Sequence, residues 1–365
     1  MTAVAPVAPV APSRTAFYPL VVADVERLTD DSAAVTFAVP RELAAAFSFA
    51  PGQSLTIRRG GERRSYSICS PAGPGFPNAR LRIGVREVAG GAVSGWLVRS
   101  VRPGDVIEAQ VPSGTFTPDL SVAASHVLIA AGSGITPMLS IAASVLAAAA
   151  SSTVTLLYGN RRSGTVMFAD EVADLKDAYP ARMRIVHVLS REPQEVELHS
   201  GRLDRDRLAR LLPATVSVPD VDHWWLCGPH RMVTDAMDLL RSLGVPGSRI
   251  HRELFWVGED PPAQATHVEA PVGAGAAVTV LLDGRSSTFT LPPGVPVLDG
   301  AQQVRPDLPF ACKGGVCGTC RARVLSGSAV MRRNYALESS EVAAGYLLTC
   351  QALPSSDELT VDYDA

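Results

Sequence analysis

The sequence predicts a multidomain protein that combines an antiparallel β-barrel, a doubly wound α/β domain and a small C-terminal domain. Three observations support this fold class. The 365 residues suit two or three domains of ordinary size. Near residue 119, short strands with an alternating pattern give way to an alternation of strands and helices. Four of the six cysteines fall between Cys312 and Cys350, close to the C-terminus, which sets that part of the chain apart.

The composition excludes several classes of protein. Apolar residues make up 47% and charged residues 19% of the chain, so wholesale disorder is excluded. The formal net charge is −3, and no basic excess draws the chain to nucleic acid or to acidic lipid. Six cysteines in a chain of this length do not make a disulfide scaffold. We therefore expect neither nucleic acid nor a membrane as a partner.

The N-terminal residues 1–17 are expected to form a disordered tail. Proline recurs every third residue in MTAVAPVAPVAPSR, and this pattern breaks any apolar helix of a signal peptide. Residues 127–150 are almost wholly apolar, but Gly132, Gly134 and Pro137 interrupt them. What remains is shorter than the ~20 residues that span a bilayer, so we expect a strand followed by a helix. With free thiols, a cytoplasmic location is expected.

Residues 18–118 read as a β-rich domain. Leu81, Ile83 and Val85 alternate with polar neighbours, as a half-buried strand requires. Short apolar runs at 34–39 and 54–57 are bounded by proline and glycine. Short strands with regular turn signals predict a barrel.

Residues 119–256 alternate between strand and helix patterns, which predicts a parallel sheet with helices on both faces. The expected strands are 126–131, 153–158, 183–189 and 223–226, and the expected helices are 136–150, 167–178, 203–212 and 231–243.

Residues 257–276 lack periodicity and read as a linker, and residues 277–365 form the last predicted domain. Strands at 278–282 and 287–291 flank Asp283 and Gly284, a strong hairpin signal. A short helix at 295–304 and a closing strand at 359–363 complete the prediction.

The C-terminal cysteines have the spacing of a plant-type [2Fe–2S] site. Cys312, Cys317 and Cys320 can occupy one loop, and Cys350 supplies the fourth thiolate from a distant segment. Glycines in the loop let backbone N–H groups approach the sulfurs, which tunes the reduction potential. The alternatives are inert thiols or structural zinc, which usually takes two Cys-x2–4-Cys pairs. Only one such pair is present here.

Two loops predict a dinucleotide site. Gly132, Gly134, Thr136 and Pro137 lie where an apolar strand runs into a helix, whose N-terminus suits a pyrophosphate. The segment Leu226–Pro229 follows a later strand of the same domain, so both loops lie at the carboxyl edge of one sheet. Either loop alone could be a packing turn.

A weaker pattern lies in the β-rich domain. Arg64, Tyr66 and Ser67 sit on one expected strand, and Gly91 and Ser94 follow a glycine turn that opens a helix. On a barrel strand such a patch is often a solvated face. Its position before a dinucleotide domain favours a flavin site.

Together these residues resemble the ferredoxin reductase-like family of flavoprotein oxidoreductases. The resemblance covers residues 17–365, and the order of domains is similar to that of reductases of multicomponent oxygenases, in particular those that serve ring-epoxidising di-iron oxygenases. The stretches that carry it are RRSYSICSP, AAGSGITPML, CKGGVCGTC and RRNYALESSEVAAGYLLTCQALP.

This resemblance implies a flavin-binding β-barrel, a nucleotide-binding α/β domain and a C-terminal β-grasp ferredoxin domain. It also implies residue roles. FAD would be held by Arg64, Tyr66, Ser67, Gly91 and Ser94; NAD(P)H by Gly132, Gly134, Thr136, Pro137, Cys227 and Gly228; Glu253 and Phe255 would lie near the flavin; and Cys312, Cys317, Cys320 and Cys350 would ligate the cluster. Ser67, Cys227 and Glu253 are the catalytic candidates.

The implied activity is transfer of electrons from NAD(P)H through FAD and a [2Fe–2S] cluster to a di-iron oxygenase. Ser190 and Arg191 follow an expected strand end where the adenosine should lie, and an arginine suits the 2′-phosphate of NADPH. A solvated loop arginine is the alternative, and NADH stays open. Arg332 and Arg333 could meet an acidic partner surface or be merely solvated.

Two other functions stay open at this point. The chain could be the reductase of a steroid or aromatic-ring hydroxylase, which only residues 334–354 and the overall similarity argue against. It could also be a non-enzymatic electron carrier or a zinc-bound interaction module.

Overall fold

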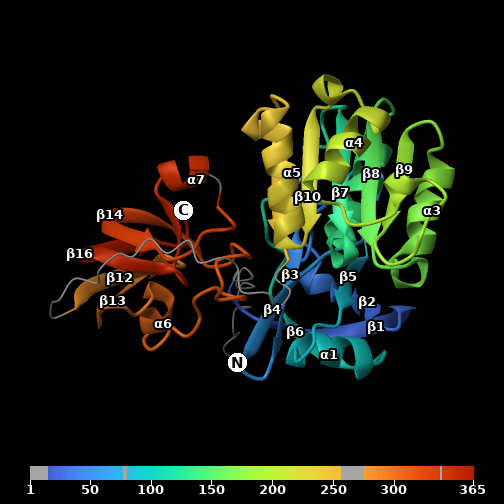
Figure 1. Cartoon of the computed structure of the whole chain (residues 1–365). Helices are drawn as coiled ribbons and strands as arrows, with labels where there is room; N and C mark the ends of the chain where they lie inside the picture. Colours follow the sequence, from blue (N-terminus) through green and yellow to red (C-terminus); the bar gives the residue numbers. More distant parts are fainter. Residues whose placement is uncertain (1–14, 77–79, 256–274, 338) are drawn as a thin grey trace.

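The computed structural model describes residues 15–76, 80–255, 275–337 and 339–365, which form three units (Figure 1). We call them the barrel unit (15–118), the parallel-sheet unit (119–255) and the C-terminal unit (275–365), and each has its own sheet. The expected tail and linker lie outside the described residues, except for 15–17 and 275–276.

The barrel unit is a six-stranded antiparallel sheet in the order β4-β3-β6-β1-β2-β5. A bridge between Ile68 and Ile83 joins its two edges and closes the barrel. Leu81, Ile83 and Val85 are buried in its core, as their alternation predicts. Its elements are β1 (Tyr18–Thr29), β2 (Ser32–Ala38), β3 (Ser54–Arg59), β4 (Glu62–Ser67), β5 (Leu81–Arg86), α1 (Ala92–Arg99) and β6 (Val106–Ala109).

The parallel-sheet unit has the strand order β11-β10-β7-β8-β9, with every pair parallel. Its elements are β7 (Ser125–Ala131), α2 (Ile135–Ala148), β8 (Thr153–Asn160), α3 (Ala169–Ala178), β9 (Met183–Leu189), α4 (Arg205–Thr215), β10 (His223–Gly228), α5 (His230–Ser242) and β11 (Ile250–Leu254). Helices α2 and α3 pack on one face of the sheet and α4 and α5 on the other. The chain reverses direction across the sheet between β7 and β10, so a ligand crevice is expected at their carboxyl ends.

The long apolar run of this unit splits as expected into β7 and α2. Helix α2 has 14 residues. Among the described helices, none has the length and hydropathy needed to cross a bilayer.

The C-terminal unit is a five-stranded mixed sheet in the order β13-β12-β16-β14-β15, in which only β12 and β16 pair in parallel. Asp283 and Gly284 form the expected turn, both with positive φ. The elements are β12 (Ala276–Leu282), β13 (Arg285–Leu291), α6 (Val297–Ala301), β14 (Arg321–Met331), α7 (Ser339–Ala343), β15 (Tyr346–Leu348) and β16 (Ala352–Asp362).

This unit differs from the sequence prediction in its details. Helix α6 is shorter than the predicted 295–304, because it begins only after Pro296 and gives way to single turns after Ala301. Strand β16 begins seven residues before the predicted 359, and the long strand β14 was not predicted.

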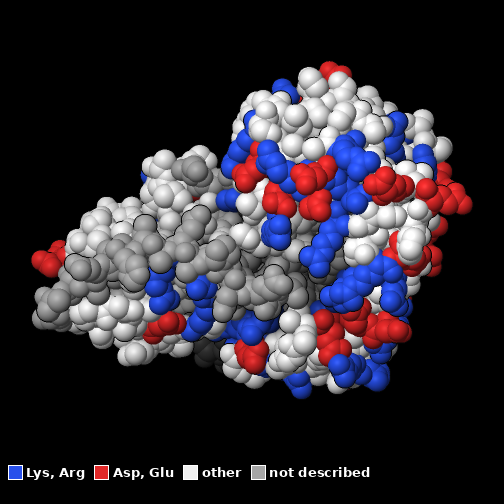
Figure 2. All heavy atoms as spheres, in the orientation of Figure 1, with Lys and Arg blue, Asp and Glu red and all other residues white. Residues whose placement is uncertain are grey.

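The three sheets confirm the fold class that the sequence predicts. On the face shown in Figure 2, acidic and basic side chains are interspersed over the barrel and parallel-sheet units, in keeping with the small net charge of −3.

Candidate functional site

Strand β4 carries the predicted flavin residues. Arg64 is half exposed; its guanidinium pairs with Glu62 at 3.0 Å and donates to the Arg63 carbonyl at 2.8 Å. Tyr66 packs against the barrel core, and burial raises the pKa of its hydroxyl. The strand therefore presents a cation that solvent can reach beside a packed aromatic ring.

Ser67, at the end of β4, reaches the neighbouring unit. Its buried hydroxyl donates to the Glu253 carboxylate on β11, with 2.9 Å between Oγ and Oε2. Desolvation raises the pKa of Glu253 to about 7, against a smaller lowering effect of the Ser67 hydrogen bond. A carboxyl group that titrates near neutrality thus lies on the junction between the two units.

Cys227 and Gly228 end β10 beside this carboxyl group. Cys227 stands opposite Glu253 in the strand register and is fully buried. Burial, and then the Glu253 charge, raises the pKa of the thiol. The Phe255 amide donates to the Gly228 carbonyl at 3.4 Å, so Phe255 also lies at this junction.

The glycine loop after β7 closes on the same place. A Cβ atom on Gly134 would lie 2.2 Å from the carbonyl oxygen of Cys227, so only glycine fits there. The hydroxyl of buried Tyr158 donates to the Gly132 carbonyl at 3.1 Å and pins the start of the loop. The structure therefore gathers Ser67, Gly134, Cys227, Gly228, Glu253 and Phe255 from four distant segments.

Thr136 and Pro137, two other predicted nucleotide residues, are buried at the start of α2. The Thr136 hydroxyl donates to the Ser133 carbonyl at 2.8 Å, and its methyl group faces Gly84 of the barrel unit. These contacts shape the loop and join the units. Helix α2 has no side-chain cap at its N-terminus, and the amide of its first residue, Ile135, donates to the carbonyls of Gly132 and Ser133 in the glycine turn.

The carboxyl ends of β8 and β9 hold the predicted adenosine end of the site. Ser190 and Arg191 donate backbone N–H groups to the carbonyls of Asn160 and Arg161, at 2.9 and 2.8 Å. Neither polar atom of the buried Asn160 amide makes a well-formed hydrogen bond within the described ranges, although the amide lies beside the Tyr158 hydroxyl, whose pKa burial raises and Asn160 lowers in part. A buried amide with spare hydrogen-bonding capacity at this sheet edge fits a polar ligand.

Gly91 and Ser94 stand at the N-terminus of α1. Gly91 is the N-cap and provides no side-chain cap, while the Ser94 hydroxyl accepts the Val88 N–H at 3.1 Å. The free N–H groups of this helix and the exposed Arg64 are the donor types that the pyrophosphate of FAD needs.

The four C-terminal cysteines interact around a closed ring. Each thiol lies near enough to two others to shift its pKa: Cys312 and Cys317 act on each other, as do Cys320 and Cys350, and Cys317 acts on Cys320 and Cys312 on Cys350. Within the described residues, no three potential ligands converge on a position for one metal ion. The spacing of the four cysteines, with three in one loop and the fourth from a distant segment, is typical of a plant-type [2Fe–2S] cluster.

Hydrogen-bond donors surround this ring. The Gly314 amide donates to Cys312 Sγ at 3.3 Å. The Gln351 side chain donates to the Lys313 carbonyl at 2.8 Å and lies 3.6 Å from Cys350 Sγ. Donors of this kind stabilise thiolates and suit cluster ligands.

Sequence reasoning missed several residues of these sites. Asn160 and Arg161 follow a strand end and could have been found by asking what lies at the carboxyl edge of β8. Gln351 adjoins a cysteine ligand candidate in the chain. The role of Arg63, described below, had no sequence signal beyond its place beside Arg64.

Three family models match the chain in order. Residues 19–117 match an oxidoreductase FAD-binding domain, residues 128–238 an oxidoreductase NAD-binding domain, and residues 280–355 a 2Fe-2S iron-sulfur cluster binding domain.

Curated relatives match over almost the whole length. A component of the 1,2-phenylacetyl-CoA epoxidase of Escherichia coli K12 is 41% identical over 358 residues, which are 96% of this chain and 99% of the relative. The ferredoxin reductase component of 3-ketosteroid-9-alpha-monooxygenase from Mycobacterium tuberculosis is 35% identical, over 94% of this chain and 95% of the relative.

Among solved structures, phthalate dioxygenase reductase has the same architecture. The TM-score is 0.59 at 25% sequence identity, covering 95% of this chain and 98% of that one.

Proposed function

The chain belongs to the family of oxygenase reductase components that join an FAD-binding, an NAD-binding and a [2Fe–2S] domain, and from this premise we propose that it supplies electrons to the di-iron oxygenase of a phenylacetyl-CoA epoxidase. It is an NAD(P)H-dependent flavin and iron–sulfur oxidoreductase, and its partner is an oxygenase. The identity of 41% with the E. coli epoxidase component, over nearly the full length of both chains, supports the specific proposal.

One structural observation supports electron transfer most directly: strand β4 touches both other units. Ser67 at one end binds Glu253 of the parallel-sheet unit. Arg63 near the other end binds the segment that leads into Cys312 of the C-terminal unit. The strand predicted to hold the flavin therefore lies between the predicted nucleotide crevice and the four thiols.

When bound, FAD would take up the hydride of NAD(P)H and the [2Fe–2S] cluster would pass on electrons singly. The residues of the chain bind and orient these groups. Arg64 and the N-terminus of α1 would hold the pyrophosphate of FAD, and Cys312, Cys317, Cys320 and Cys350 would hold the iron. Buried Cys227 and the packed Gly134 loop exclude water from the crevice, and Glu253 holds or releases a proton near pH 7 beside Ser67.

We further propose NADPH as the preferred donor. Arg161 and Arg191 are exposed, and backbone pairing holds their chain segments side by side at the ends of β8 and β9. Two guanidinium groups there suit a 2′-phosphate.

Arg191→Ala tests this preference. A lost charge-assisted contact costs about 1.5–3 kcal/mol, so the KM for NADPH should rise about tenfold or more, while the KM for NADH should change little. An unchanged KM for NADPH would contradict the proposal. Arg231→Ala is the control, since Arg231 is an exposed arginine on α5.

The partner is tested by reconstitution. The purified chain and NADPH should support epoxidation of phenylacetyl-CoA by the oxygenase components of that system. Turnover with the oxygenase of a steroid hydroxylase instead would replace this partner by the alternative that the M. tuberculosis relative represents.

Arg332 and Arg333 are proposed to contact that oxygenase. Arg332 is exposed, and its amide donates to the carbonyl of Gln351, next to Cys350. Reversing both charges should slow oxygenase-coupled turnover and leave reduction of ferricyanide unchanged.

We also infer a cytoplasmic location, supported by six free cysteines.

A further inference from the structure

We propose that Arg63 is the positioning residue that holds the C-terminal unit, with its four-thiol ring, against the flavin strand β4. The inference rests on the proposed electron-transfer function but not on the identity of the oxygenase.

Arg63 grips the backbone of the C-terminal unit. Its Nη1 donates to the Leu308 carbonyl at 3.2 Å and its Nη2 to the Pro306 carbonyl at 3.3 Å. Its guanidinium also lies 4.2 Å from the centroid of the Phe310 ring. A planar guanidinium can make this fork and this stacking contact together, and a lysine cannot.

The segment that Arg63 contacts, residues 306–310, is anchored in the C-terminal unit and leads directly into the cysteine loop. The Leu308 side chain is fully buried in the core of the C-terminal unit. Phe310 stands two residues before Cys312, and its ring also lies 4.9 Å from the Lys313 ammonium. By holding the Leu308 carbonyl, Arg63 therefore also helps to position the loop that carries Cys312 and Cys317.

The surroundings of Arg63 make hydrogen-bond acceptors necessary for its guanidinium. Its guanidinium is half-buried and lies 5.1 Å from the Phe17 ring. Burial, and then the positive charge of Arg58, lowers the pKa of Arg63. A desolvated cation beside a like charge needs acceptors, and the two carbonyls of the C-terminal unit provide them.

Few other contacts between described residues join this unit to the other two. Within the described part of the chain, no hydrophobic cluster joins the C-terminal unit to the other two. A second contact is His230, the first residue of α5, which packs edge-on against Tyr335 with 5.3 Å between ring centroids. The Tyr335 amide donates to the Gly315 carbonyl at 3.0 Å, so this second contact also adjoins the cysteine loop.

The test separates electron transfer through the C-terminal unit from reduction of the flavin. Holoprotein oxidises NAD(P)H to NAD(P)+ with release of a proton to solvent, and its two electrons reduce either two ferricyanide or two cytochrome c molecules. Ferricyanide is expected to accept electrons at the flavin, and cytochrome c through the cluster. No oxygenase is needed, so an error in the proposed partner does not affect the result.

Arg63→Ala should lower the rate of cytochrome c reduction about tenfold, because small misplacements of reacting groups are costly. The ferricyanide rate and the EPR spectrum of the reduced cluster should stay as in the wild type, and small-angle X-ray scattering should show a larger radius of gyration. Arg63→Lys should recover only part of the rate, since it restores the charge without the fork.

Arg182→Ala is the matched control. Arg182 also donates to two carbonyls, of Ala149 and Ser152, and lies 4.7 Å from the Tyr179 ring, but within the parallel-sheet unit. Both acceptor rates and the radius of gyration should stay unchanged. If Arg63→Ala does not fold, Phe310→Leu removes the ring contact from the other side and leaves the two carbonyl hydrogen bonds, so it should change the cytochrome c rate and the radius of gyration in the same direction but less.

Two results would overturn the proposal. The cytochrome c rate and the radius of gyration of Arg63→Ala could equal those of the wild type. Alternatively, the ferricyanide rate could fall in parallel with the cytochrome c rate, which would place the effect at the flavin instead.

Discussion

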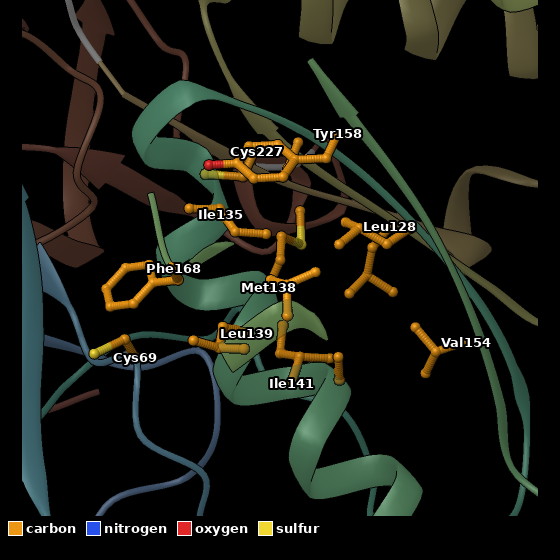
Figure 3. Packing of buried hydrophobic residues seen from close by; sticks show 14 of the residues in the cluster. Cys69, Leu128, Ile135, Met138, Leu139, Ile141, Val154, Tyr158, Phe168 and Cys227 are labelled. Atoms are coloured by element: carbon orange, nitrogen blue, oxygen red, sulfur yellow. The ribbon is translucent and has the colours of Figure 1, made fainter. Parts of the chain in front are cut away.

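The junction between the barrel and parallel-sheet units is built differently from the junction that both make with the C-terminal unit. At the first, one hydrophobic cluster contains Ala34, Cys69 and Phe116 together with residues of α2. Figure 3 shows Cys69 of the barrel unit near Leu139 of α2 and Phe168. Buried hydrogen bonds cross it, such as the one from the Ser140 hydroxyl to the Ser70 carbonyl at 2.7 Å.

Between described residues, the second junction has a guanidinium that binds two carbonyls and one ring, and a pair of aromatic rings. Hydride transfer needs two rings held in fixed contact, so a shared core suits the first junction. A domain that must also serve an external partner gains from a smaller contact. The difference predicts that a substitution can stop electron transfer through the C-terminal unit while the other two units remain active.

The largest effect is expected from a substitution that disables the C-terminal unit alone. Changes around metal ligands already cost about 10–100-fold, so Cys350→Ser, which removes a ligand candidate, should reduce the cytochrome c rate at least about a hundredfold. The ferricyanide rate should survive because the first junction is untouched. Cys69→Ser, a change at a buried thiol outside the ring, is the control. Persistence of both rates in Cys350→Ser would show that the assumed electron order is wrong.

The next test strains the shared core. A Cβ atom on Gly84 of β5 would lie 2.8 Å from the Phe168 ring across the first junction. Overpacking of this kind costs about 1–3 kcal/mol, so Gly84→Ala should lower the melting temperature of the two-unit core by about 5 °C. Gly61→Ala, where a Cβ meets nothing within 4 Å, should leave it unchanged. Equal melting temperatures for both variants would mean that the junction is looser than described.

The last test, whose effect is spread over a range of pH, concerns protonation at the first junction. The pKa of Glu253 is raised from 4.5 to about 7, so the folded state holds a proton that the unfolded state releases. The free energy of unfolding should therefore fall as pH rises from about 4.5 to 7, by at most about 3 kcal/mol, and level off above that.

Glu253→Gln should lack this fall. Denaturant unfolding of the flavin-free protein, followed by the fluorescence of Trp224 and Trp225, measures it, since both are buried in the parallel-sheet unit. Parallel pH profiles for the wild type and the variant would contradict the described environment of Glu253.

Local pattern was enough to predict most of the strands and helices, because it depends on periods of two and 3.6 residues within one segment. The cysteine spacing likewise predicted a four-thiol site. Contacts between units were beyond such reasoning. Ser67 and Glu253 are 186 positions apart in the sequence, and Arg63 and Leu308 are 245 apart. These contacts depend on how the folded units pack against one another. Strand β14 escaped prediction because only Ala322 among its residues is fully buried, which leaves little apolar alternation to see.

The most direct test of the electron path is an anaerobic titration of the purified chain with NADPH, followed by visible absorption and EPR. The structure and the family predict FAD and a [2Fe–2S] cluster in equal amounts, flavin absorbance that bleaches on addition of NADPH, and the EPR signal of a reduced cluster appearing with it. A colourless, zinc-containing protein, or a flavin that bleaches while the cluster stays oxidised, would contradict the path from NADPH to the four-cysteine site.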